Sequence, residues 1–335
     1  MLLVASPRFE EHVTPPGHPE RMERAQLFNA LAAGWVKQGG PRAEPRSVRR
    51  EELARVHDAA YLDHLAATAG RAVMLDPDTY TSPESIEIAA LAAGATVQAA
   101  EHAVQHRGAS FALVRPPGHH AERDKAMGFC LYNNAAVAAA AVRSQGIARL
   151  AIVDIDVHHG NGTQWMFYGD RSVLYISTHQ YPFYPGTGAA DEIGTGEGKG
   201  FTVNVPLEAG AGDADYHVVY SGIVTPVLEQ FAPQFVIVSA GYDAHELDPL
   251  ASMRVTTDGY YGIVATLSSI ARRLGGLALV TEGGYHLGAM KDCLEASFTA
   301  VQSGNGWPSR PPGTPVRGDR AIAAVRAAQG QYWRL

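Results

Sequence analysis

The sequence predicts an α/β protein: one open, mostly parallel sheet with helices on both faces. Two observations lead to this fold class. Short β-branched runs are continuously apolar, which is typical of strands buried on both faces, and helical patterns alternate with them. With 335 residues, 46% hydrophobic and 18% charged, the chain can bury a large core, which excludes a disordered chain and a coiled coil. We expect a single domain over residues 1–335.

The expected strands are the apolar runs at residues 110–114, 150–155, 173–177, 235–239 and 277–281. The expected helices are at residues 83–106, 132–145, 213–231, 258–274 and 287–302. Residues 303–335 form a basic C-terminal extension with five arginines and one aspartate. Within it, residues 320–329 are typical of a short amphipathic helix that packs on the body or on a neighbouring subunit.

Charge and composition exclude several classes of partner. A formal net charge of -7 opposes direct binding of nucleic acid. Two cysteines, Cys130 and Cys293, are too few for a disulfide framework or a sulfur-ligated zinc site and fit a reducing compartment. No apolar run reaches the roughly 18 residues of a membrane span, and we see no basic leader. We therefore expect a cytoplasmic protein without membrane contact, and homo-oligomerisation stays open.

Polar motifs follow all five expected strands: RPPGHH, DIDVHHGNG, STH, GYDAH and EGGY, in chain order. In an open parallel sheet, ligands bind outside the carboxyl ends of the strands. These separate segments are therefore expected to meet in one crevice.

Three of these residues form a candidate metal site. Asp156 and His158 stand two apart at a strand end and can turn to the same side, and Asp243 supplies a third ligand beyond Gly241, which allows a sharp bend. Taken alone, these residues have simpler interpretations. Asp156 and His158 could cap a loop, and Asp243 could be a turn residue or a helix N-cap. Two oxygens and one imidazole without a thiolate suit zinc with an open position, with ferrous iron and cobalt as alternatives.

Four further residues suggest acid-base chemistry beside this site. His119 and His120 follow a rigid Pro-Pro-Gly stretch and can move protons, although two surface histidines would look the same. Tyr285 follows a Gly-Gly bend, where it either packs or donates a hydrogen bond to an oxyanion. Asp154 is a buried strand aspartate that must be paired, with a histidine or with a second cation.

The motifs RPPGHH, GFCLYNN, DIDVHHGNGTQ, FYPGTG, SAGYDAHELDPL and EGGY, in this order between about His18 and Ser303, resemble those of the histone deacetylase family. This family of zinc-dependent amidohydrolases includes acetylpolyamine amidohydrolases, and the HHGNG form is similar to its class II branch. The resemblance implies a single open α/β domain with a mostly parallel, eight-stranded sheet.

The resemblance also implies roles for the residues of the centre. Asp156, His158 and Asp243 would bind one catalytic zinc ion, with His120 as general base and acid. His119 would be its electrostatic partner, and Tyr285 would polarise the acyl carbonyl. Asn161 would orient His120; this residue is neutral, whereas many members of the family carry aspartate there. Asp154, Ser177 and Thr178 would lie at a structural potassium ion, together with the backbone carbonyls of Asp156 and His158.

The same resemblance assigns a substrate tunnel. Gly128 and Phe129 match one wall and Tyr184 the opposing aromatic wall, which together would hold a linear aliphatic stem. Asp78 aligns with a rim aspartate that grips the substrate backbone. Leu250 matches another rim position, where a carboxylate would suit acetylpolyamines and leucine does not. Arg21 is assigned to the lining of an inner cavity through which acetate leaves.

The expected activity is hydrolysis of N-acyl amides of primary amines, with acetyl-lysine or a similar alkyl amide as substrate. The alternatives are an acetylpolyamine amidohydrolase and a catalytically silent protein that binds acylated amines. An arginase-type ureohydrolase is a further rival with a similar architecture, but its two bridged manganese ions demand more convergent carboxylates than Asp156 and Asp243 provide beside Asp154.

Overall fold

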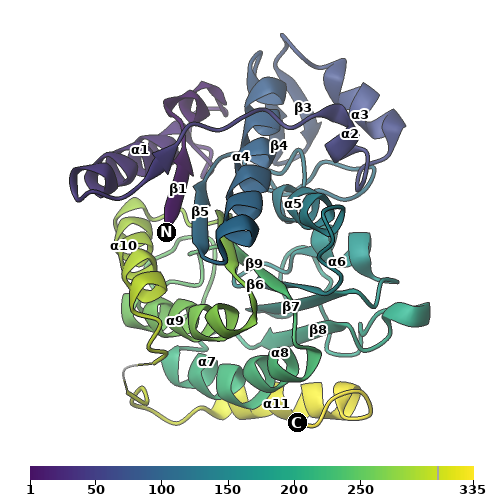
Figure 1. The fold of residues 1–335 in the computed structure, drawn as a ribbon, viewed down its shortest axis with the longest axis vertical. Coiled ribbons are helices and arrows are strands. Elements are labelled where there is room, and N and C mark those ends of the chain that lie inside the picture. The colour runs from purple at the N-terminus through teal and green to yellow at the C-terminus, as the bar shows by residue number, and fades with distance from the viewer. Residues whose placement is uncertain (308) are drawn as a thin grey trace.

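The computed structural model describes residues 1–307 and 309–335. Its centre is an eight-stranded sheet of order β2-β1-β5-β10-β9-β6-β7-β8 (Figure 1), in which every pairing is parallel. A separate two-stranded antiparallel ribbon pairs β3 with β4. The strands are β1 (Leu2–Ala5), β2 (Arg42–Ala43), β3 (Val73–Asp76), β4 (Thr79–Thr81), β5 (Ala109–Leu113), β6 (Leu150–Asp154), β7 (Val173–Gln180), β8 (Thr202–Leu207), β9 (Phe235–Ala240) and β10 (Leu277–Thr281).

Helices cover both faces of the sheet, and each face has its own apolar core. One core contains residues of α1 (Met22–Lys37), α7 (Asp213–Val219), α8 (Thr225–Phe231), α9 (Thr257–Leu274), α10 (Leu287–Ser303) and α11 (Val316–Gln329). The other contains residues of α2 (Arg50–Leu53), α3 (Ala59–Ala66), α4 (Ser85–His106), α5 (Asn134–Arg143) and α6 (Asn161–Phe167). The predicted α/β fold class, with one parallel sheet between two helical layers, is confirmed.

The strand β10 shows why the runs are continuously apolar. Leu277 and Leu279 belong to one core, while Ala278 and Val280 belong to the other. Because successive side chains of a strand point to opposite faces, a strand between two helical layers needs apolar residues at every position. This burial is the physical origin of the pattern that predicts the fold.

All five expected strands are present, with ends shifted by up to a few residues. The helix expected over 213–231 is α7, a π-helical turn over Tyr220–Val224 and α8 in direct succession. The C-terminal helix begins at Val316, four residues before the expected start. The five-strand pattern omits β1, β2 and β8 of the large sheet and both strands of the ribbon, and the expected helices omit α1, α2, α3 and α6.

The connections divide at the centre of the sheet. From β6 the chain moves outward to β7 and β8, whereas from β9 it moves the other way to β10. The helix α6, which follows β6, lies on one face, and α9, which follows β9, lies on the other. Adjacent strands whose connections leave toward opposite faces open a crevice at their carboxyl ends. The fold thus places a binding site between β6 and β9.

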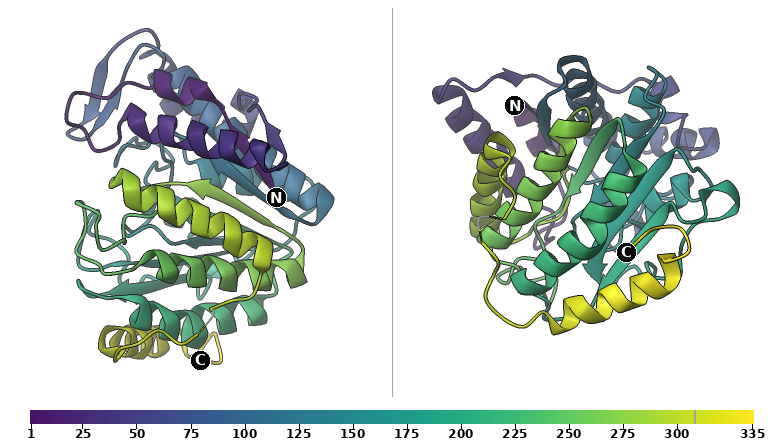
Figure 2. Two further views of the ribbon diagram at one scale, coloured as in Figure 1. Left: turned by 90° about the vertical axis from the view of Figure 1, so that its left-hand side faces the viewer. Right: turned by 60° about the horizontal axis from the view of Figure 1, so that its bottom comes forward.

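The C-terminal extension packs against the body of the protein. Figure 2 shows α11, in yellow, along the end of the sheet beside β8. The Gln329 side chain donates a hydrogen bond of 2.5 Å to the carbonyl of Thr202, and the Trp333 indole donates one of 2.8 Å to the carbonyl of Gly200. The expectation that this helix packs on the body agrees with these contacts.

Among the described residues, no helix has the length and apolarity needed to cross a bilayer. The cytoplasmic location stays a prediction.

Candidate active site

The sequence motifs do converge at the carboxyl ends of the central strands. Asp154 is the last residue of β6, with Asp156 and His158 just beyond it, and Asp243 follows β9. On the neighbouring strands, His119 and His120 follow β5, and Tyr285 follows β10. The site is therefore built from loops whose starting points the sheet fixes.

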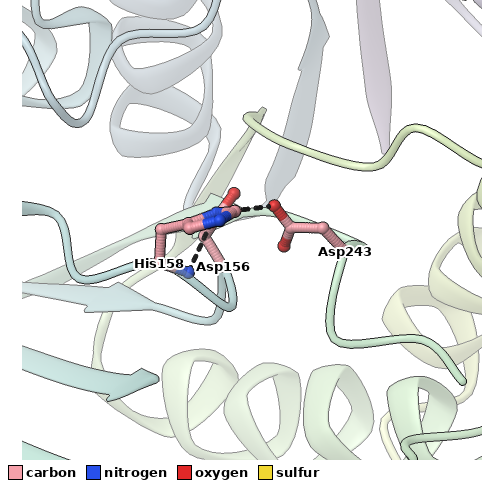
Figure 3. Close-up of side chains that lie close together, drawn as sticks. All are labelled: Asp156, His158 and Asp243. Carbon is pink, nitrogen blue, oxygen red and sulfur yellow. Dashed lines mark hydrogen bonds and ion pairs between the residues drawn. The ribbon is translucent and has the colours of Figure 1, made fainter. Parts of the chain in front are cut away.

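Asp156, His158 and Asp243 form a compact cluster (Figure 3). Each offers one ligand atom, and these atoms all lie within 4.8 Å of one another. Nδ1 of His158 lies 3.2 Å from Oδ1 of Asp156 and 3.1 Å from Oδ2 of Asp243. Both carboxylates are fully buried, and two buried carboxylates so close together need a cation between them or beside them.

The backbone around this cluster also fits a metal ion. The amide of Gly283 donates to Oδ2 of Asp156 at 2.8 Å, and the amide of Val157 donates to Oδ1 of Asp243 at 2.8 Å. A Cβ at Gly241 would lie 2.0 Å from Oδ2 of Asp156, and a Cβ at Gly283 would lie 2.1 Å from Oδ2 of Asp243. The absence of a side chain at Gly241 and Gly283 therefore leaves room for these carboxylate oxygens. The donor set of two oxygens and one imidazole nitrogen suits zinc.

The two histidines after β5 are buried side by side, with their ring centroids 4.0 Å apart. Nδ1 of His119 lies 3.0 Å from Oδ2 of Asp154, and Nδ1 of His120 lies 2.7 Å from Oδ1 of Asn161. Each ring therefore has a hydrogen-bond partner behind it, a carboxylate for His119 and a neutral amide for His120.

These environments move the pKa values of the two rings in opposite directions. Burial lowers the pKa of His119, but the carboxylates of Asp156 and Asp154 outweigh it, so its pKa lies well above the usual value. Burial also lowers the pKa of His120, and the neighbouring charges of His119 and His158 lower it further. The two environments thus favour the charged form of His119 and the neutral form of His120.

Tyr285 is held by its backbone at the end of β10. Its amide donates a 2.7 Å hydrogen bond to Oδ2 of Asp248, which also accepts from the amide of His286 at 3.2 Å. The guanidinium of Arg24 donates to the carbonyl of Gly284 at 2.9 Å, and its Cζ lies 5.2 Å from the centre of the Tyr285 ring. Tyr285 is 8% exposed, so its side chain is largely shielded from bulk water.

The two expected tunnel walls are both close to the site. The ring of Phe129 packs edge-on against Tyr285, with centroids 5.8 Å apart, and the ring of Tyr184 packs edge-on against His120 at 5.2 Å. Gly128 has a positive φ of 56°, and a Cβ there would lie 2.3 Å from the His120 ring. Phe183, which the sequence analysis missed, stacks on His158 at 5.4 Å.

The two expected rim residues, Asp78 and Leu250, lie in different turns of the structure. Asp78 lies in the turn between β3 and β4, next to Thr79, whose hydroxyl accepts a hydrogen bond from the amide of Phe129 at 3.0 Å. Burial and the neighbouring carboxylate of Asp76 raise the pKa of Asp78. Leu250 is partly exposed, and its amide donates to Asp248 at 3.0 Å. Asp78 is thus next to a wall, and Leu250 shares a turn with the residue that holds Tyr285.

The residues expected at a potassium ion lie on neighbouring strands. Asp154 and Ser177 are register partners of β6 and β7. The Ser177 hydroxyl contacts Nδ1 of His179 at 2.8 Å, whereas the Thr178 hydroxyl contacts the phenol of Tyr220 at 3.4 Å. Because adjacent side chains alternate along a strand, only the backbone carbonyl of Thr178 can serve a site beside Asp154.

The structure corrects the assignment of Arg21. Its side chain is exposed and lies 3.9 Å from Glu23 at the start of α1, so it lines no inner cavity. Arg24, one helical turn later, is fully buried and contacts the carbonyls of Glu282 and Gly284 beneath Tyr285. Its charge is balanced by Glu20 at 2.9 Å. The i, i+4 spacing of Glu20 and Arg24 is the signal that could have identified it.

Two further buried acids were missed. Glu20 also accepts two hydrogen bonds from the guanidinium of Arg115, of 2.7 and 2.8 Å. Glu282 accepts from the amides of Gly118 and His119 at 2.6 and 3.2 Å, and burial raises its pKa to about 7. Glu282 lies within the EGGY motif that was quoted for Tyr285, and through these hydrogen bonds both acids hold segments that carry the site.

The arrangement of these side chains agrees with the result of comparing the sequence with models of protein families. The model of the histone deacetylase domain matches residues 18–301. The chain belongs to the histone deacetylase family. A hydrolase that acts on amide bonds, as expected from the sequence, is confirmed by this membership.

Several members of the family are similar along most of the chain. A probable deacetylase of Archaeoglobus fulgidus is 39% identical over 308 residues, which cover 90% of this chain and 86% of that protein. Histone deacetylase 15 of Arabidopsis thaliana is 43% identical over 303 residues, 88% of this chain but 53% of that protein. A histone deacetylase-like amidohydrolase of Pseudomonas aeruginosa is 38% identical over 288 residues, 84% of this chain and 74% of that protein. The solved structure of the HDA15 HD domain superposes with a TM-score of 0.92 at 37% identity, covering 99% of this chain and 94% of that one.

Proposed function

We propose that the protein hydrolyses N-acyl amides of primary amines, with acetyl-lysine or a similar linear alkyl amide as substrate. The products are a carboxylate and a free amine. The observation that carries this proposal is the three-ligand cluster of Asp156, His158 and Asp243 beside two buried histidines and a tyrosine. A protein that only binds acylated amines has no need of groups that move protons.

Asp156, His158 and Asp243 are proposed to hold one zinc ion. Zinc bound there supplies Lewis acidity toward the acyl oxygen and toward water. The cluster offers three protein ligands and no thiolate, which is typical of a catalytic site with an open position.

The proton transfers are assigned to His120. Its Nδ1 is engaged by Asn161, so Nε2 is the nitrogen that accepts a proton from the attacking water and returns it to the leaving nitrogen. His119, paired with Asp154 at 3.0 Å, places a positive charge beside the developing oxyanion. The Tyr285 hydroxyl donates a hydrogen bond to the acyl oxygen from the β10 side of the site.

Substrate binding is assigned to the two aromatic walls. Phe129 and Tyr184 would enclose an aliphatic stem, with Gly128 allowing the wall to approach His120. Asp78 would contact the substrate at the rim, and the apolar Leu250 would offer nothing to a second ammonium group. This arrangement favours acetyl-lysine over acetylpolyamines, which are the alternative substrates.

The remaining expectations are proposals of the same kind. Asp154, Ser177 and the carbonyl of Thr178, with the carbonyls of Asp156 and His158, would bind a structural potassium ion. Residues 1–335 would act as one catalytic domain with residues 303–335 as a basic extension. The acylated amine would be its partner in a cytoplasmic setting, without direct contact with nucleic acid or membranes.

The deciding experiment measures hydrolysis of a fluorogenic acetyl-lysine peptide before and after removal of metal by a chelator. Activity is expected to disappear on chelation and to return on addition of one equivalent of zinc per chain. Activity that does not respond to metal removal would contradict the proposal. Comparison of kcat/KM for acetyl-lysine peptide, acetylspermidine, acetylputrescine and longer acyl-lysines then identifies the substrate class.

A further inference from the structure

A carboxylate stands behind the residue that contacts His120. The side-chain amide nitrogen of Asn161 donates a 2.6 Å hydrogen bond to Oε1 of Glu122, while its carbonyl oxygen lies 2.7 Å from Nδ1 of His120. The same nitrogen lies 3.4 Å from the sulfur of Met127. Glu122, Asn161 and His120 therefore form a linear chain of hydrogen bonds that ends at the imidazole.

The direction of this chain is set at Glu122. An ionised carboxylate only accepts hydrogen bonds, so the NH2 group of Asn161 must face it. The carbonyl of Asn161 then faces His120, and a carbonyl only accepts. Nδ1 of His120 must therefore carry the hydrogen, which leaves the lone pair of the neutral ring on Nε2. Without the carboxylate, only the sulfur of Met127, a weak acceptor, would favour this orientation of the amide over the flipped one.

The flipped orientation is disfavoured by the same distances. It would place two acceptor oxygens, of Asn161 and Glu122, at the 2.6 Å now spanned by a hydrogen bond. It would also turn the NH2 group toward His120 and move the ring hydrogen to Nε2, where a base needs a lone pair. Because Asn161 is 2% exposed and His120 is 4% exposed, water has little access to compensate.

Hydrogen bonds hold the loop that carries Glu122 in place. The backbone carbonyl of Glu122 accepts a 2.9 Å hydrogen bond from Nδ1 of the buried His57. Nε2 of His57 in turn accepts one from the amide of Asn133 at 3.0 Å. The backbone amide of Glu122 donates a hydrogen bond to the carbonyl of Lys125 at 2.9 Å. Among the described residues, no arginine, lysine or histidine nitrogen lies within 4.0 Å of the Glu122 carboxylate. Its charge is therefore available to polarise Asn161.

We propose that Glu122 is a positioning residue that acts through Asn161, fixing the tautomer of His120 with the hydrogen on Nδ1 and supplying the negative charge that the amide lacks. This inference rests on the proposed role of His120 as base. The protein would thus place its anion one residue farther from the imidazole than a direct His-Asp pair does.

The first test reads the tautomer without substrate. Nitrogen NMR spectra of the full-length chain labelled in histidine are recorded at about pH 8, where a neutral imidazole is expected, before and after zinc loading. The His120 resonances are assigned by their absence from the His120→Ala variant. We expect a protonated Nδ1 in the parent and in Glu122→Gln, whose carbonyl can still accept from Asn161, and a mixture of tautomers in Glu122→Ala.

The second test uses kinetics with an acetyl-lysine peptide. A positioned base contributes roughly 100-fold to 10,000-fold, so partial loss of the correct tautomer in Glu122→Ala is expected to lower kcat by about 10-fold, with KM within about 2-fold. The Glu122→Gln variant, which loses only the charge, is expected to lose about 3-fold. The matched control is Asp124→Asn, an exposed acid in the same loop, which removes one charge without touching Asn161.

Replacing Asn161 separates positioning from a structural role. In an Asn161→Asp background the carboxylate contacts His120 directly, so adding Glu122→Ala should leave kcat unchanged or raise it. An equal loss in both backgrounds, or a parent-like tautomer in Glu122→Ala, would overturn the inference. A parent without hydrolase activity would refute the proposed function instead, and the spectra would still decide the role of Glu122.

Discussion

Gly283 offers a strict test of the proposed metal site, because a side chain at this position would collide with two of the proposed ligands. A Cβ at this position would lie 2.1 Å from Oδ2 of Asp243 and 2.7 Å from Oδ2 of Asp156, whereas real Cβ contacts under 3.0 Å are essentially never seen. In Gly283→Ala, the Asp243 oxygen must therefore retreat by about 1 Å, several times the roughly 0.2 Å tolerance of a metal-ligand distance. Zinc affinity is expected to fall by about 10- to 100-fold or more, as it does when ligand orientation is lost.

The assay is competition for zinc with a coloured chelator, which requires no substrate. Gly34→Ala is the matched control, because Gly34 lies in α1 with nothing within 4 Å of its would-be Cβ, and alanine in a helix is favourable by about 1 kcal/mol. If Gly283→Ala bound zinc as tightly as the control, the three residues would not be the ligands in the arrangement described.

Three further predictions concern other parts of the molecule. Tyr285→Phe keeps the ring packing but removes the hydroxyl, so kcat on an acetyl-lysine peptide should fall by about 100- to 1,000-fold with little change in KM; an unchanged kcat would exclude the proposed hydrogen bond. Glu20→Gln leaves the buried guanidinium groups of Arg24 and Arg115 without a counter-charge, and the free energy of unfolding in guanidinium titrations should fall by about 3 to 5 kcal/mol; a loss under about 1 kcal/mol would show that the cluster is not required. Burial lowers the pKa of His57 to about 4. Between this value and the ordinary pKa of about 6.5, the unfolded chain binds a proton at His57 that the folded chain does not bind. As the pH falls from 6.5 to 4, the free energy of unfolding should therefore decrease by up to about 3 kcal/mol. His57→Asn should flatten that part of the stability profile, and an equal slope in the variant would assign the effect to other groups.

The sequence predicts the centre of the fold better than its edges. The strands β5, β6, β9 and β10 are buried between two helical layers, so nearly every position is apolar and the strands are recognisable in the sequence. The polar exceptions are Ser110, Asp154, Ser239 and Thr281. The edge strand β2 has two residues and β1 has four, too short for a recognisable run. The β8 sequence, TVNVPL, alternates and contains a proline, as an outer strand can, so it does not match the pattern of buried strands.

The candidate site divides in a similar way. Most of the residues proposed to bind the metal or the substrate lie in motifs that follow strands, where the topology of a parallel sheet brings them together. The residues that hold them are harder to find, because their role depends on burial. Arg21 and Arg24 look alike in the sequence, and only the packing of α1 shows which of them reaches the β10 loop. Glu122 and Asp248 are likewise ordinary surface acids until their hydrogen bonds are known.

The contacts of Gln329 and Trp333 with the carbonyls of Thr202 and Gly200 have a consequence for how copies of the molecule behave together. Thr202 belongs to β8, and in a parallel ladder its oxygen points away from the neighbouring strand β7, so it would be free to pair with a strand of another molecule. The final segment occupies this oxygen with the Gln329 side chain. The segment is therefore expected to protect this edge of the sheet against extension by another molecule, and so against aggregation.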